Sequence, residues 1–79
     1  SIPIFTTSSN SAIVTVTFIG HGLSIGNTFI FPIGTTANGV TIKGDYQVTA
    51  VTDANNFQIG VSTQATSSGT SSANNSPSR

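Results

Sequence analysis

The chain lacks cysteine, methionine and tryptophan, and only four of its 79 residues are charged. Without cysteine, neither a disulfide framework nor a thiolate metal site can form. The single histidine, His21, and the two carboxylates, Asp45 and Asp53, are too few for a closed metal site, which normally needs three or four protein ligands. We therefore expect no metal and no cofactor.

The scarcity of charge also limits the partners. Lys43 and Arg79 balance Asp45 and Asp53, so that charged residues make up 5% of the chain, against about 25% in ordinary soluble domains. Such a surface cannot neutralise a row of phosphates, and we expect no nucleic-acid partner. Polarity comes instead from Ser and Thr, which supply 25 residues.

Association with other chains is the support that remains for so short a chain. A domain of this size buries only about 60% of its unfolded surface, and small domains compensate with disulfides, metals or partner chains. Zero net charge favours association as well. No apolar run reaches the roughly 20 residues of a membrane span, and no basic-then-apolar signal pattern is present. We expect a homo-oligomer or a complex with other proteins, and no membrane.

The hydrophobic pattern predicts strands and almost no helix. Apolar and polar side chains alternate with a period of two, the pattern of half-buried strands. Residues 52–55 have turn formers at both ends and predict a four-residue hairpin loop. The predicted fold is a small all-β domain over residues 12–62, a four- to five-stranded antiparallel barrel or sandwich. Its strands are expected at 12–19, 27–33, 40–42, 45–51 and 56–61.

One predicted strand, 27–33, is apolar on both faces. This pattern fits either a strand covered on both sides or an edge strand that meets a neighbouring subunit. Pro32 has no N–H to donate to a neighbouring strand and favours an edge or a strand end.

The two ends of the chain each leave two alternatives. Residues 1–11 carry an apolar Ile2-Pro3-Ile4-Phe5 cluster and predict either a short first strand or an arm that docks on a partner. Residues 63–79 are small or polar and have no apolar periodicity, so that alone they cannot bury enough surface to become ordered. They are expected to be a flexible tail or linker, or an extended arm along a neighbouring subunit.

The stretch "GHGLSIG" (20–26) poses the question of chemistry. His21 is the only plausible general base, and Ser24 is the nearest hydroxyl. No Gly-Lys-Ser/Thr sequence, helix or acidic ribose partner follows, which argues against a phosphate loop. We interpret the stretch as a corner between strands in which His21 hydrogen-bonds a main-chain carbonyl, and Leu23 and Ile25 plug the barrel end. The expected turn residues are Gly20, His21, Gly22, Gly26, Asp53 and Asn55.

Two further candidate sites are weaker. Asp45 and Asp53 form the only possible pair of glycosidase carboxylates, but capping of turn amides explains both. The five Phe and Tyr46 alternate along strands and indicate a core, with a carbohydrate-stacking platform as the alternative. We expect no catalytic residue and no enzyme.

The motifs in order resemble a small β module of tailed-bacteriophage virion proteins, found in tail, baseplate, fibre and attachment components. The resemblance covers about residues 12–61, although Asn27 replaces the usual Asp and the segment after Phe31 is longer. The matching motifs are His21-Gly22-Leu23, Gly26-Asn27, Gly44-Asp45-Tyr46-Gln47-Val48 and Thr52-Asp53-Ala54-Asn55-Asn56-Phe57.

This resemblance implies a non-enzymatic structural component of the virion, assembled in the host cytoplasm with copies of itself or with other tail or capsid proteins. The alternative is a receptor- or glycan-binding module displayed on the virion, which would recognise a host-surface glycan. The expected subunit contacts are the apolar side chains Ile2, Ile4, Phe5, Phe29, Ile30, Phe31 and Ile33.

Overall fold

The structure, a computed structural model, describes residues 2–73, which form strands and no helix. No helix long and apolar enough to cross a membrane is therefore present in this part of the chain. The all-β prediction is confirmed, with six strands instead of four or five. In chain order they are β1 (Ile4–Thr7), β2 (Ile13–Thr17), β3 (Thr28–Ala37), β4 (Val40–Asp53), β5 (Asn56–Gly60) and β6 (Gly69–Ser72).

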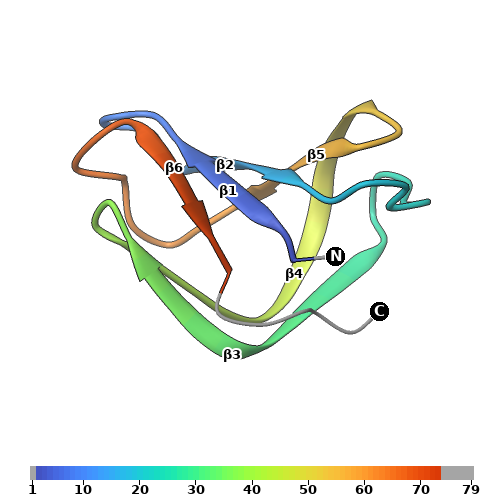
Figure 1. The fold of residues 1–79 in the computed structure, drawn as a ribbon, viewed down its shortest axis with the longest axis horizontal. Coiled ribbons are helices and arrows are strands. Elements are labelled where there is room, and N and C mark those ends of the chain that lie inside the picture. Colours follow the sequence, from blue (N-terminus) through green and yellow to red (C-terminus); the bar gives the residue numbers. More distant parts are fainter. Residues whose placement is uncertain (1, 74–79) are drawn as a thin grey trace.

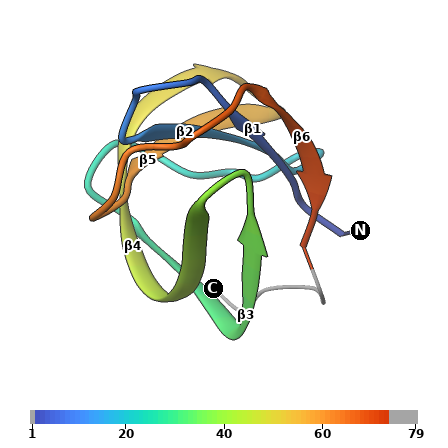
Figure 2. The same ribbon diagram turned by 90° about the vertical axis from the view of Figure 1, so that its left-hand side faces the viewer.

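The strands form one antiparallel sheet in the order β3-β4-β5-β2-β1-β6. The hairpin of β3 and β4 is thus inserted in sequence between the neighbours β2 and β5. The sheet curls into an incomplete ring, a half-barrel whose two edge strands are β3 and β6 (Figures 1 and 2). The position of β3 at an edge agrees with Pro32, which lies where the register between β3 and β4 shifts.

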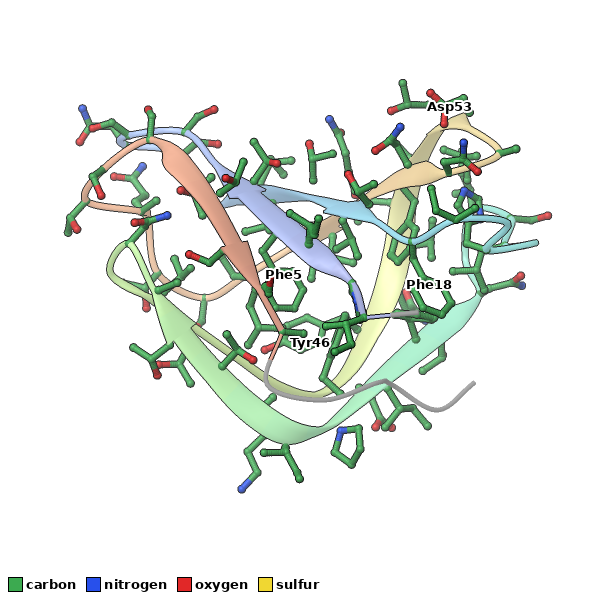
Figure 3. All side chains as sticks on the ribbon, in the orientation of Figure 1. Phe5, Phe18, Tyr46 and Asp53 are labelled. Carbon is green, nitrogen blue, oxygen red and sulfur yellow. The ribbon has the colours of Figure 1, made fainter. Side chains whose placement is uncertain are left out.

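The concave face of the sheet forms the core. Phe5 of β1 lies opposite Val16 of β2, which lies opposite Phe57 of β5, so one buried row crosses three strands. Figure 3 shows Phe5 pointing into the interior of the half-barrel. The Phe29 ring makes edge-on contacts with Phe31 and Phe57 at centroid distances of 5.1 and 5.0 Å, a favourable arrangement of aromatic rings. The core is therefore formed by the apolar side chains of the period-two pattern, which point toward the concave face of the sheet.

Strand β4 joins two predicted strands, 40–42 and 45–51, into one bent strand. Its first half pairs with β3 and its second half pairs with β5. Gly44 lies within the half that pairs with β3, opposite Phe31, and has φ +89°, a left-handed backbone that glycine adopts without steric cost. From the sequence, this glycine was expected to separate two strands, whereas in the structure it lies at a bend within one continuous strand.

The turn between β3 and β4 closes one end of the half-barrel. The Asn38 side-chain amide donates to Thr7 Oγ1 (3.0 Å), and the Asn38 carbonyl accepts from the Thr66 N–H (2.9 Å). A Cβ on Gly39 would lie 2.6 Å from Thr66 Oγ1, so residue 39 has no room for a side chain. We call Thr7, Asn38 and Thr66 the Asn38 latch, because these residues link the β3–β4 turn to the opposite end of the sheet order.

The sheet extends beyond the expected domain of residues 12–62 on both sides. Residues 4–7 form β1, which decides between the two alternatives for the N-terminal segment in favour of a strand. Residues 69–72 form β6 and pair with β1 of the same chain, which corrects the expectation of a flexible tail for the part of 63–79 that is described. The polarity of this segment misled the prediction, because strand pairing orders it through main-chain hydrogen bonds. Residues 74–79 of the expected tail lie outside the described residues.

Candidate functional site

The loop between β2 and β3 reverses the chain through three glycines. Gly20, Gly22 and Gly26 have φ values of +65°, +64° and +92°, the left-handed region that favours glycine. Figure 1 shows this loop projecting at one end of the half-barrel, beside the turn between β4 and β5. We call residues 20–26 the His21 corner. Its prediction as a turn rather than a phosphate loop agrees with these backbone angles.

His21 is buried, with 2% of its surface exposed, and main-chain groups bind both of its ring nitrogens. Nδ1 accepts a hydrogen bond from the Leu23 N–H (2.9 Å), which leaves Nε2 to carry the proton and donate to the Asp53 carbonyl (2.7 Å). The predicted bond to a main-chain carbonyl is therefore present. The ring also packs edge-on against Phe57 at a centroid distance of 5.2 Å. These contacts fix a neutral imidazole as part of the fold.

The His21 corner and the β4–β5 turn are joined by further main-chain bonds. The His21 N–H donates to the Ala54 carbonyl (3.1 Å), and the Gly20 N–H donates to Asn55 Oδ1 (3.0 Å). The Phe18 N–H donates to the Asn55 carbonyl (2.8 Å). The two turns that the sequence singled out, 32 residues apart at His21 and Asp53, thus form one hydrogen-bonded cluster.

Asp53 shapes the β4–β5 turn with its side chain, as predicted. Asp53 Oδ1 accepts from the Asn55 N–H (2.8 Å) and from the Asn56 side-chain amide (3.0 Å). The bond from the Asn55 main chain, followed by that from Asn56, lowers the pKa of Asp53 below its ordinary value of 3.8. Figure 3 places Asp53 at the tip of the hairpin, away from the core. The loop itself is shorter than the four residues expected, because β4 runs to Asp53 and β5 begins at Asn56.

Asp45 does not cap a turn, contrary to the expectation from the sequence. It lies within β4 opposite Ile30, and its carboxylate accepts no hydrogen bond from residues 2–73. Asp45 and Asp53 are separated by eight residues of one strand, on the order of 20 Å. This separation exceeds that of any glycosidase carboxylate pair. Within residues 2–73, no three potential metal ligands meet and no pocket is present.

The seven expected contact residues divide into two groups. Ile2, Ile4 and Ile33 are exposed, at 54%, 41% and 55% of their surface, and Ile30 is half-buried. Phe5, Phe29 and Phe31, in contrast, are at most 2% exposed and belong to the core of this chain. The expectation for these three was wrong because each lies on the strand face that turns inward, in register with buried neighbours.

Four exposed aliphatic side chains were missed by the sequence analysis: Ile13, Ile19, Ile25 and Val51. The alternating pattern of β2 indicates that Ile13 is exposed, since Ile13 lies on the face opposite Val14. Ile25 was expected to plug the barrel end, yet 69% of its surface is exposed; only Leu23 packs partly against the core. The described surface therefore offers scattered aliphatic side chains on a sheet whose outer strands are β3 and β6.

No protein-family model, curated protein or solved structure matches this chain.

Proposed function

We propose that the chain is a non-enzymatic structural unit that assembles with copies of itself or with neighbouring proteins in the virion of a tailed bacteriophage. The observation that carries the proposal is a curled sheet whose outer strands are β3 and β6, in a chain with exposed isoleucines and four charged residues. Soluble monomers usually protect such edges with charged side chains, bulges or covering segments. Strand β3 contains a register shift at Pro32, but its side chains carry no charge and it exposes Ile33.

The virion context is supported by the resemblance of residues 12–61 to the phage β module. Two of its motifs, at His21-Gly22-Leu23 and at Thr52–Phe57, are the segments that bind each other through the His21 ring. A motif whose residues stabilise a turn of the fold has a structural role. The resemblance therefore supports a mechanical role, in which the chain acts through its contacts with the other structural proteins of the particle.

A glycan-binding role would need exposed aromatic side chains or a groove. All six aromatic side chains are buried or half-buried, and the Tyr46 hydroxyl accepts a hydrogen bond from the Lys43 N–H (3.0 Å). No observation favours this alternative, and we do not propose it.

The assembly role is tested by sedimentation velocity of the full chain and of single serine variants. Ile33→Ser on the β3 edge and Ile4→Ser on β1, beside β6, are expected to weaken self-association. Ile19→Ser removes the same side chain from a more exposed position in the loop, and it is expected to associate like the parent chain. Equal loss in all three variants would indicate nonspecific hydrophobic contact and contradict assembly through the sheet edges.

The virion context has a separate test. Mass spectrometry of purified particles of the encoding phage is expected to detect the chain at a fixed copy number relative to the other structural proteins. Its absence from intact particles would contradict the virion role.

A further inference from the structure

We infer that strand β6 is exchangeable, and that the edge of β1 which it occupies receives β6 from a second copy of this chain. This inference deepens the proposed assembly role and rests on it. Strand β6 differs from the other strands in the interactions that keep it in the sheet. Its sequence is Gly-Thr-Ser-Ser, and none of its residues is fully buried.

The central strands are held by side chains in the core. Val14 and Val16 of β2 and Phe57 and Ile59 of β5 are all 0% exposed. The segment that contains β6 is anchored instead by two alanines, Ala65 and Ala73. Because local stability follows the burial of apolar surface, β6 is expected to open more readily than the strands beside it.

The segment is held in place mainly by hydrogen bonds. Ala65 exchanges two main-chain bonds with the turn after β1: its carbonyl accepts from the Asn10 N–H (2.8 Å), and its N–H donates to the Ser11 carbonyl (2.9 Å). At the other end, the Ala73 N–H donates to the Pro3 carbonyl (2.9 Å). Between them, β6 pairs with β1 from Thr7–Gly69 to Ile4–Ser72.

An identical segment from a second copy makes all of these bonds equally well. The groups that bind the segment lie on Pro3 and β1, on the turn that follows β1 and on Asn38, all of which stay in place when the segment leaves. Exchange therefore sacrifices no native contact of the segment. Domain exchange of this kind is a low-cost route to association.

A hinge for the movement lies between β5 and Ala65. Val61 is fixed by its N–H bond to the Ala12 carbonyl (2.8 Å), whereas residues 62–64 are exposed and make no hydrogen bond within the described chain. Extended, these three residues span about 10 Å. Straightening this link carries Ala65 and β6 away from their own β1. Reciprocal exchange then gives a dimer, and one-way exchange gives an open series of copies.

Disulfide trapping tests the inference directly, because the chain contains no other cysteine. Full-length Thr6→Cys and Thr70→Cys chains, one of them isotope-labelled, are mixed under native conditions with oxidised glutathione. Thr6 and Thr70 are register partners across β1 and β6, so exchange between copies brings the two thiols together. Mass spectrometry is expected to show a heterodisulfide that increases with protein concentration.

The matched control is a mixture of Thr15→Cys and Gln58→Cys chains. These positions are register partners across β2 and β5, which buried side chains hold in place. No heterodisulfide above random collision is expected here. Equal yields in the two mixtures, or none in the first, would overturn the inference. Should Thr6→Cys not fold, Ile4→Cys with Ser72→Cys provides a second register pair across the same strands.

A doubly substituted chain separates this inference from the proposed assembly role. In Thr6→Cys/Thr70→Cys, oxidation at low protein concentration locks β6 to its own β1, and sedimentation velocity of this disulfide-locked monomer at high concentration is expected to show loss of association that reduction restores. Undiminished association of the locked chain would overturn strand exchange while leaving the assembly role intact. A wild-type chain that stays monomeric, together with no heterodisulfide in the mixture of Thr6→Cys and Thr70→Cys chains, would overturn both.

Discussion

The imidazole Nε2 of His21 lies 2.7 Å from the main-chain carbonyl oxygen of Asp53, and this bond joins two turns that are 32 residues apart in the sequence. His21 is the only histidine of the chain, and it is committed to the fold on both ring nitrogens. The bond makes the His21 corner and the β4–β5 turn a single unit at one end of the half-barrel. The Asn38 latch has the corresponding role at the β3–β4 turn.

Replacement of His21 by Gln is expected to lower the free energy of unfolding. The variant disturbs two hydrogen bonds at a site that is 2% exposed. Leaving a buried donor or acceptor unpaired costs about 1–3 kcal/mol. Urea unfolding is expected to show this loss for His21→Gln and almost none for Ser24→Ala, whose side chain makes no bond with residues 2–73. Equal stability of the two variants would contradict a structural role for His21.

Gly22 is a second test of the same corner. Its φ of +64° is disfavoured for a β-branched side chain, so Gly22→Val is expected to lower the free energy of unfolding by about 1–2 kcal/mol or more. Gly22→Asn is the matched control, because Asn tolerates left-handed backbone far better than Val. Thermal unfolding compares the two. A loss as large for Asn as for Val would indicate that space, rather than backbone angle, demands glycine.

Asp53 is expected to make stability depend on pH in the acid range. Its pKa is lowered in the folded chain by the bonds from Asn55 and Asn56, so the charged carboxylate contributes stability above the unfolded value near 3.8. That contribution is lost as the pH falls through the still lower folded pKa. Urea unfolding at neutral pH is expected to show the parent chain as more stable than Asp53→Asn. The difference is expected to shrink as the pH is lowered below 3.8 and the carboxylate of the folded chain becomes protonated; a difference that is constant with pH would refute this account.

Loss of the Asn38 side chain is expected to loosen the segment that contains β6. Asn38→Gly keeps the left-handed backbone (φ +53°) and removes the bond to Thr7 Oγ1, at a cost of about 0.5–1.5 kcal/mol. Amide hydrogen exchange is expected to accelerate at Ala65 and Thr66. Asn10→Gly, the other asparagine with positive φ (+65°), is the matched control, since its side chain makes no bond with residues 2–73. Equal acceleration in both variants would mean that chain flexibility, not the latch, is responsible.

Phe57 is the side chain whose loss the core should tolerate least. It is fully buried, and its ring contacts those of Phe29 and His21. Phe57→Ala is expected to cost about 3–5 kcal/mol, a large share of the 5–15 kcal/mol that stabilises a typical domain. Ile25→Ala, at a position 69% exposed, is expected to change the free energy of unfolding by no more than about 0.5 kcal/mol. A large effect at Ile25 in thermal unfolding would restore the idea that it plugs the barrel end.

The sequence predicted the parts of the fold that alternate. The period-two pattern predicted β2 and β5. The same pattern indicates that Phe29 and Phe31 point toward one face of their strand, but both were expected at subunit contacts because so small a chain was expected to associate. Strand β6 was missed because main-chain pairing with β1 defines it, and its side chains carry no apolar signal. The bend at Gly44 and the exposure of Ile25 depend on how distant strands meet. Period and local turn chemistry do not encode that information.

The candidate site was predictable to a similar extent. The single histidine between two glycines indicated a corner and a bond to a main-chain carbonyl. The identity of the acceptor, Asp53, required the three-dimensional placement of β4 beside the loop. The Asn38 latch could not be predicted, because its partners Thr7 and Thr66 carry no signal in the sequence that links them to Asn38.

Self-association of the unmodified chain tests the central claim most directly. Sedimentation velocity over a wide concentration range is expected to show species heavier than the 8.0 kDa monomer, with a share that grows with concentration. A stable 8.0 kDa monomer at every concentration would contradict the assembly of copies through sheet edges.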